Sequence, residues 1–207
     1  MLNRREMLLR AGAAAVGLGF GGFPLGWAAQ KGNAKRVLFF TKSAGFEHSV
    51  IKRDGDKLSF AEQILTDLGK KHGFEVTATK DGGVFSSDEL ASYDAFVFYT
   101  TGDLTTEGTD GQPPMTPQGK EALLQAVHDG KGFVGIHCAS DTFHSEGDRK
   151  IVQAIEKRDP YIRMLGGEFI THGKQQEARL SVVDPSFPGA EGLGETVRLL
   201  EEWYALK

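Results

Sequence analysis

The greatest density of side chains able to transfer protons, attack a substrate or bind metal lies in the segment 131–144. Within one turn, its second half contains His137, Cys138, Ser140, Asp141, Thr142 and His144. Its first half, 132–136, is a short apolar run, which predicts a strand buried on both faces. The carboxyl end of such a strand opens onto the ligand crevice of an open α/β sheet. We therefore expect the main functional site in this turn.

Two further loops carry polar groups towards the same edge of the expected sheet. His48 follows the first expected strand, 35–42, and Thr101 and Gly102 follow the third, 93–100. Strands that alternate with helices pair in parallel, and in a flavodoxin-like order the loops after strands one, three and four share a rim. The sequence thus predicts a three-layer α/β sandwich with a mainly parallel sheet. Thr101 and Gly102 would offer a hydroxyl and a backbone N–H to substrate oxygens.

Periodicity and capping residues set the expected limits of the other elements. A helix after the first strand is predicted by apolar residues at helical spacing, namely Leu58, Ala61, Leu65 and Leu68. Its expected N-cap is Asp54 or Asp56, and Gly73 lies just past its end. Thr116 predicts the start of another helix that ends at Asp129. Further strands are expected at 74–79, 178–183 and 197–206, and further helices at 149–157 and from 160 to about 166.

The segment 135–139 (GIHCA) invites comparison with a nucleophile elbow, in which a strained strand-to-helix turn exposes one reactive side chain. The exposed position of such a turn is occupied here by His137, and Cys138 follows one residue later. A tight turn would aim the Cys138 thiol elsewhere. Two interpretations stay open for Cys138, a small buried thiol and a nucleophile, and the first is favoured.

Histidines and carboxylates of the expected rim suit two kinds of chemistry. His137 and His144 are candidates for a general base, for a metal ligand, or for a hydrogen-bonded histidine without a chemical role. Asp141 either caps the following segment or orients one of the two histidines. Strand alternation would turn Glu202 or its neighbour inward beside aromatic rings, where a carboxyl could act as an acid. Imidazoles together with Asp141 or Glu202 would suit a divalent metal such as zinc, although no tight ligand motif marks a site and the metal stays unknown.

Composition and the N-terminus set limits on the class of protein. The chain of 207 residues has a formal net charge of −4 and one cysteine, which excludes an internal disulfide. Residues 1–29 begin with a twin-arginine pattern, Arg4-Arg5, followed by a Gly/Ala-rich apolar run and small residues at 28–29. This predicts a signal peptide for twin-arginine export to the periplasm or exterior, and no stable membrane anchor. An acidic domain without a Lys/Arg cluster gives no basis for nucleic-acid binding.

Five motifs in order across 36–204 resemble the ThuA-like (trehalose utilisation) family, a branch of the class I glutamine-amidotransferase-like superfamily. They are 41–48 (TKSAGFEH), 100–104 (TTGDL), 135–144 (GIHCASDTFH), 166–172 (GGEFITH) and 201–204 (EEWY). The resemblance implies a flavodoxin-like domain over 35–207, in which His137 replaces the amidotransferase cysteine. It also implies a link to trehalose and oxidised (keto) disaccharides. Two departures are Gly173 where the family has proline after His172, and the expected continuation of the family domain past Tyr204, which suggests a domain truncated at its C-terminus.

These observations together predict an exported enzyme that acts on a disaccharide or keto-sugar derivative. The expected catalytic residues are His137, Asp141, His144 and Glu202, and the expected substrate-binding residues are His48, Thr101, Gly102 and His172. The expected partner is a small carbohydrate, and a homo-oligomer is left open. The alternatives are a non-catalytic sugar-binding or interaction module on the same fold, and a cysteine amidohydrolase that uses Cys138.

Overall fold

The computed structural model describes residues 34–190 and 192–207. The signal peptide predicted for residues 1–29 lies outside this range. Within it, none of the helices combines the length and the apolar character that crossing a bilayer requires.

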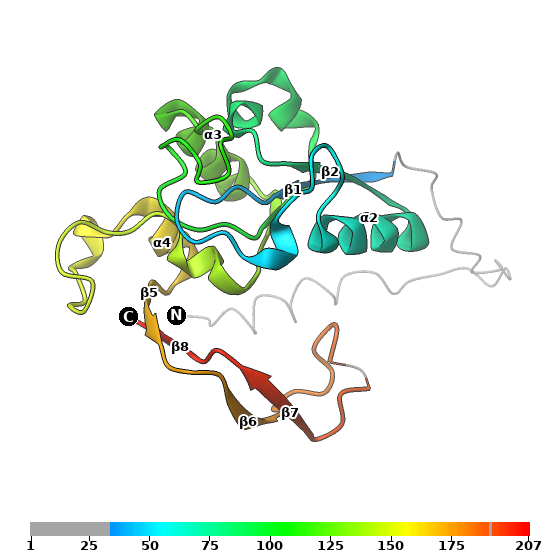
Figure 1. The fold of residues 1–207 in the computed structure, drawn as a ribbon, viewed down its shortest axis with the longest axis vertical. Coiled ribbons are helices and arrows are strands. Elements are labelled where there is room, and N and C mark those ends of the chain that lie inside the picture. Colours follow the sequence, from blue (N-terminus) through cyan, green and yellow to red (C-terminus); the bar gives the residue numbers. More distant parts are fainter. Residues whose placement is uncertain (1–33, 191) are drawn as a thin grey trace, which may run out of the picture. The chain divides into compact units, whose positions relative to one another are not determined.

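The centre of the fold is a four-stranded parallel sheet with the strand order β2-β1-β3-β4 (Figure 1). Its strands are β1 (Lys35–Phe40), β2 (Phe74–Thr79), β3 (Ala95–Phe98) and β4 (Gly132–Gly135). Helices α2 (Phe60–His72) and α3 (Pro117–His128) lie on opposite sides of the sheet, and α4 (Pro160–Leu165) follows later in the chain. The predicted flavodoxin-like α/β class and parallel sheet are confirmed.

One face of the sheet holds the main hydrophobic core. Leu38 and Phe40 of β1 alternate with residues on the opposite face, and with Phe96 and Phe98 of β3 they are fully buried. Leu123 of α3 and, from α4, Tyr161 and Ile162 pack against them. The 3-10 helices η2 (Gly82–Ser86) and η3 (Asp88–Ser92) complete this face with Phe85 and Leu90.

Helix α2 begins at Phe60, two residues after the start of the predicted apolar stripe at Leu58, and its N-cap is Ser59. Ser59 Oγ accepts a hydrogen bond from the Glu62 backbone N–H, and the Glu62 carboxylate accepts one from the Ser59 N–H, which forms a capping box. The prediction that Asp54 or Asp56 caps this helix is therefore wrong, because the capping box fixes a later start. Gly73, at φ 79°, ends the helix as predicted.

Two other predictions fail for identifiable reasons. Strand β4 is not buried on both faces, since the Val134 side chain is 52% exposed. It also lies at an edge, because among the described strands it pairs only with β3. The expected helix over 149–157 is instead turn and extended chain with one 3-10 turn, η5 (Ile155–Lys157). Its apolar residues Ile151 and Val152 are exposed, so no packing surface supports a helix there.

The C-terminal strands form two antiparallel pairs. β5 (Phe169–His172) pairs with β8 (Tyr204–Leu206), and β6 (Gln176–Ser181) pairs with β7 (Thr196–Glu201). The single strand predicted over 197–206 is thus two strands with different partners, separated at 202–203. This break leaves Glu202 outside either ladder.

Candidate functional site

The loops after β1, β3 and β4 are joined side by side by backbone hydrogen bonds. The Ala44 N–H donates to the Thr101 carbonyl at 2.8 Å, and the Gly102 N–H donates to the Asp141 carbonyl at 2.8 Å. Gly102 has φ 76°, and a Cβ there would lie 2.6 Å from the Ala44 carbonyl carbon, so only glycine fits. The ends of these three parallel strands therefore form a continuous rim.

Thr101 and Gly102 hold this rim together and do not present donors to a ligand. The Thr101 hydroxyl donates to the Phe46 carbonyl at 2.8 Å, and the Gly102 N–H is used by Asp141. Thr101 is also buried. The sequence predicts that these two residues donate to substrate oxygens; in the structure both donors already have acceptors within the protein.

His137 occupies the sharp turn between β4 and the 3-10 helix η4 (His137–Asp141). Its φ is +47°, in the left-handed region that non-glycine residues seldom adopt. The turn is held because the Ile136 N–H donates to the Phe98 carbonyl at the end of β3. Backbone strain of this kind is concentrated at functional sites. The imidazole of His137 thus occupies the exposed position of an elbow-like turn.

Around His137 the structure collects side chains from four segments, which we call the rim cluster: His48, His137, His172, Glu202 and Tyr204. The His48 and His137 ring centroids are 4.9 Å apart. His137 Nε2 lies 3.1 Å from the Tyr204 hydroxyl and 3.8 Å from Glu202 Oε2. Ligand atoms of His48, His137 and Glu202 all lie within 4.8 Å of one another. Four of the residues predicted for the site are therefore brought together.

The β5–β8 ladder explains how His172 reaches the cluster. His172 pairs with Tyr204 across the ladder, and their rings stack with centroids 5.5 Å apart. The His172 Nδ1–H donates to the Gly173 carbonyl at 2.8 Å, which turns Nε2 towards Glu202 Oε2, 3.8 Å away. Glu202, released from both ladders, is placed between His137 and His172.

Burial shifts the pKa of three side chains at the site, those of His48, Tyr99 and Tyr204. It lowers the pKa of His48, and the nearby His137 lowers it further, against a smaller opposing effect of Glu202. His48 is therefore neutral at pH 7. Burial raises the pKa of Tyr99 to about 12 and also raises the pKa of Tyr204, so both hydroxyls stay protonated. The cluster thus combines a neutral imidazole, a carboxyl group and phenol donors.

Asp141 and His144 belong to a second, neighbouring group. His144 Nε2 lies 3.0 Å from Asp141 Oδ1, and its Nδ1 lies 3.1 Å from Glu168 Oε1. Arg149 Nη2 donates to Asp141 Oδ1 at 2.8 Å and also contacts His144. Burial raises the pKa of Glu168, but hydrogen bonds from Ser145 and His144 outweigh it and hold this pKa below its usual range. The Asp141 carboxylate therefore contacts His144, and His137 instead contacts the other members of the rim cluster.

Cys138 is 1% exposed, and burial raises the pKa of its thiol to about 12. A thiol that stays protonated and has no access to substrate is a poor nucleophile. The geometry thus supports the interpretation of Cys138 as a small buried side chain.

Three contacts of the site were not expected from the sequence. Glu168 anchors His144, Tyr99 borders His48 and His137, and the exposed Phe46 lies beside His48 with ring centroids 4.9 Å apart. Tyr99 directly follows the apolar core of the third strand, and Glu168 lies inside the 166–172 motif, so both carried a positional signal. The only signal for Phe46 in the sequence was its position two residues before His48.

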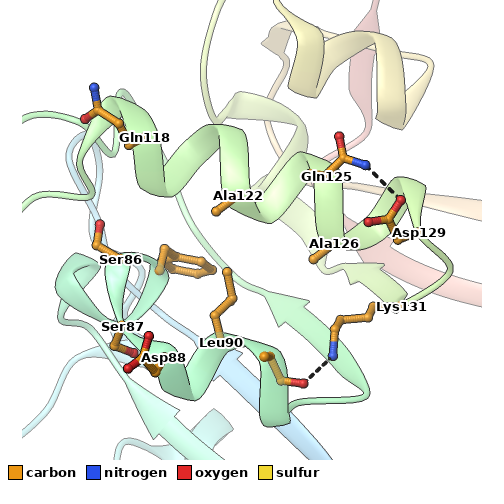
Figure 2. A pocket seen from close by; sticks show the side chains of 12 residues that line it. Ser86, Ser87, Asp88, Leu90, Gln118, Ala122, Gln125, Ala126, Asp129 and Lys131 are labelled. Carbon is orange, nitrogen blue, oxygen red and sulfur yellow. Dashed lines mark hydrogen bonds between the residues drawn. The ribbon is translucent and has the colours of Figure 1, made fainter.

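A separate groove of about 620 Å³ lies between η2, η3 and α3 (Figure 2). Phe85, Leu90 and Ala122 provide its apolar lining. Two of its three charged residues have partners: Lys131 donates to the Ala91 carbonyl, and Asp129 accepts from Gln125. No residue predicted for the site lines it, so the rim cluster remains the candidate site.

The fold and the rim define an α/β domain of the flavodoxin-like class with a histidine–carboxylate site at the carboxyl edge of its sheet. The chain belongs to the ThuA family: the family model described as "Trehalose utilisation" matches residues 36–207. A search of the curated proteins finds no significant match.

Two solved structures of ThuA-like proteins are similar to this chain. The one from Bacteroides uniformis is 22% identical with a TM-score of 0.57, over 89% of this chain and 65% of that chain. The one from Parabacteroides merdae is 20% identical with a TM-score of 0.49, over 84% and 64%. The first similarity supports the fold, and this chain spans 65% of the length of that structure.

Proposed function

We propose that this protein acts on a sugar or sugar derivative, a disaccharide or keto-sugar, by proton transfer at the rim cluster. The observation that carries the proposal is the meeting of His48, His137 and Glu202, from three distant segments, within 4.8 Å. Membership of a family described by trehalose utilisation supports a carbohydrate as the substrate. The chemistry is assigned to the cluster because it pairs an imidazole with a carboxyl group.

In this proposal His137 is the general base or acid and Glu202 is its acid–base counterpart. The strained turn keeps the His137 ring at the rim. The contact between Tyr204 Oη and His137 Nε2 fixes the orientation of the ring. His172 holds the Glu202 carboxylate from the other side. His144 and Asp141 act by positioning, because their mutual contact and the buried Glu168 fix the end of η4.

An exposed aromatic side chain supports a sugar as the ligand. Phe46 is 71% exposed and is perpendicular to the His48 ring. The apolar C–H face of a pyranose packs on such a ring while its hydroxyls meet the polar side chains behind it. Phe46 would thus form one wall of the sugar site.

The test is a screen of the full chain against disaccharides and their keto derivatives, with product detection by mass spectrometry. We expect turnover of at least one of these sugars and none of matched polyols without a ring. Saturable binding of a sugar without product, over long incubation, would instead indicate a sugar-binding module. Binding and turnover both absent across the panel would contradict the proposal.

We also propose export through the twin-arginine route, which the Arg4-Arg5 pattern supports. Replacing both arginines by lysine (R4K/R5K) should keep the protein in the cytoplasm, because receptors of this route read the arginine pair. Fractionation of cells with an antibody to the chain measures the distribution. The wild type should be periplasmic or secreted, and equal distribution of wild type and variant would refute export by this route.

A further inference from the structure

The ligand set in the rim cluster is that of a transition-metal site. Histidine, histidine and carboxylate, brought from three segments, are the three protein ligands of many catalytic zinc sites, in which a fourth position stays open for water or substrate. Two imidazoles favour zinc or a similar ion over magnesium or calcium, which prefer all-oxygen ligands.

His48 carries an unusual orphan atom. Its Nδ1 is buried and has no hydrogen-bond partner among the described residues. A buried polar atom without a partner costs free energy, which a ligand bond can recover. Because His48 also faces His137, the orphan side chain belongs to the same cluster as the other two ligands.

The surroundings orient the carboxylate ligand as the second layer of a metal site does. His172 Nε2 lies 3.8 Å from Glu202 Oε2. His172 is itself fixed by its Nδ1–H bond to the Gly173 carbonyl. A group in this position holds a carboxylate ligand in the required orientation.

The cluster needs a small contraction to enclose an ion. Metal–ligand bonds of 2.0–2.2 Å place tetrahedral ligand atoms about 3.4 Å apart, and the three atoms here lie within 4.8 Å. Glu202 can supply the movement, because it lies between β7 and β8 and outside both ladders. The Tyr204 hydroxyl must turn aside from His137 Nε2 at the same time.

We propose that His48, His137 and Glu202 form a binding site for one divalent transition-metal ion, of which zinc is the best fit, with an open position facing the rim. A role of this ion in polarising a sugar oxygen rests on the proposed function. The binding of the ion does not, because it is a property of the three side chains alone.

The test is titration of the untagged, chelator-treated full chain with Zn²⁺ by calorimetry, and with Co²⁺ by visible absorption. We expect one ion per chain and an intense cobalt spectrum typical of a four-coordinate site. H48A and E202Q should each weaken Zn²⁺ binding by at least about 100-fold, because each removes one of three ligands. H128A is the matched control: His128 is an exposed histidine beside Asp129 at the end of α3, and its loss should leave binding unchanged.

H144A separates the rim cluster from the neighbouring group. Zn²⁺ affinity that is lost in H144A but kept in H48A and E202Q would overturn the proposal, as would equal affinity in the wild type and these two variants. Circular dichroism of each variant verifies folding, and E202Q keeps the shape of the side chain. Sugar turnover by a protein that does not bind Zn²⁺ would refute this site and leave the proposed function intact. One bound Zn²⁺ per chain without turnover of any sugar would refute the proposed function and leave the metal site intact.

Discussion

Replacing His137 by alanine should lower kcat on the sugar substrate by about 10³-fold, within the range that general acid–base catalysis contributes. The free energy of unfolding should change by no more than about 1 kcal/mol. The imidazole is partly exposed, and among the described residues its polar contacts are to Tyr204 and Glu202. Steady-state kinetics and chemical denaturation of the same preparation measure the two quantities.

The positive φ at position 137 allows a second variant that keeps the turn. Asparagine tolerates the left-handed region better than alanine, so H137N should be at least as stable as H137A and equally inactive. H128A is the control, since it removes an exposed histidine remote from the rim and should retain full activity. Wild-type kcat in both His137 variants would remove this residue from the mechanism.

Replacing Glu62 by alanine should destabilise the domain by about 3 kcal/mol, the lower end of the range for breaking a buried ion pair, because Arg53 keeps partial access to water. Glu62 is fully buried, and its carboxylate accepts hydrogen bonds from Arg53, Thr41 and Ser59. Arg53 also donates to the Ala78 carbonyl. The side chain therefore ties α2 to the ends of β1 and β2.

Acid should remove the same stabilisation in the wild type. Burial raises the pKa of Glu62, but the hydrogen bonds from Arg53, Thr41 and Ser59 outweigh it and leave the pKa below its usual value. A depressed pKa in the folded state stabilises the protein above the unfolded value of about 4.3, and this contribution is lost as the pH falls below it.

Urea denaturation at pH 7 and at decreasing pH measures both effects. E62Q should show a smaller loss of stability on acidification than the wild type. E75A is the matched control, because Glu75 is exposed and forms a surface ion pair with Arg36 at 3.8 Å. This substitution should lower the free energy of unfolding by less than about 1 kcal/mol. Equal destabilisation by E62A and E75A would contradict the role assigned to Glu62.

The sequence was sufficient where local signals agreed with burial. β2 matches the expected 74–79, and the Thr116 cap with Pro117 marks the start of α3. It was insufficient where tertiary context decided the outcome. The capping box at Ser59 outcompeted Asp54 and Asp56, and the 149–157 segment had no surface against which to form a helix.

The same division holds for the site. Parallel topology predicted that loops carrying His48 and His137 would meet, since carboxyl ends of parallel strands share one edge. Topology does not determine which side chains pair within the loops. Asp141 pairs with His144 because the 3-10 helix η4 directs the Asp141 side chain towards it. The Thr101 hydroxyl donates its hydrogen bond to the Phe46 carbonyl. These choices depend on positive φ angles and loop-to-loop bonds that no spacing rule encodes.

Sugar binding at the rim cluster can be tested directly through the six histidines of the chain. Their imidazole C–H resonances can be assigned by NMR with single substitutions and followed while a sugar from the screen is added. We predict that the signals of His48, His137 and His172 shift together and saturably, while those of His72 and His128 stay fixed. A saturable shift confined to His72 or His128, or sugar binding that leaves the His48 and His137 signals unmoved, would rule out the rim cluster as the sugar site.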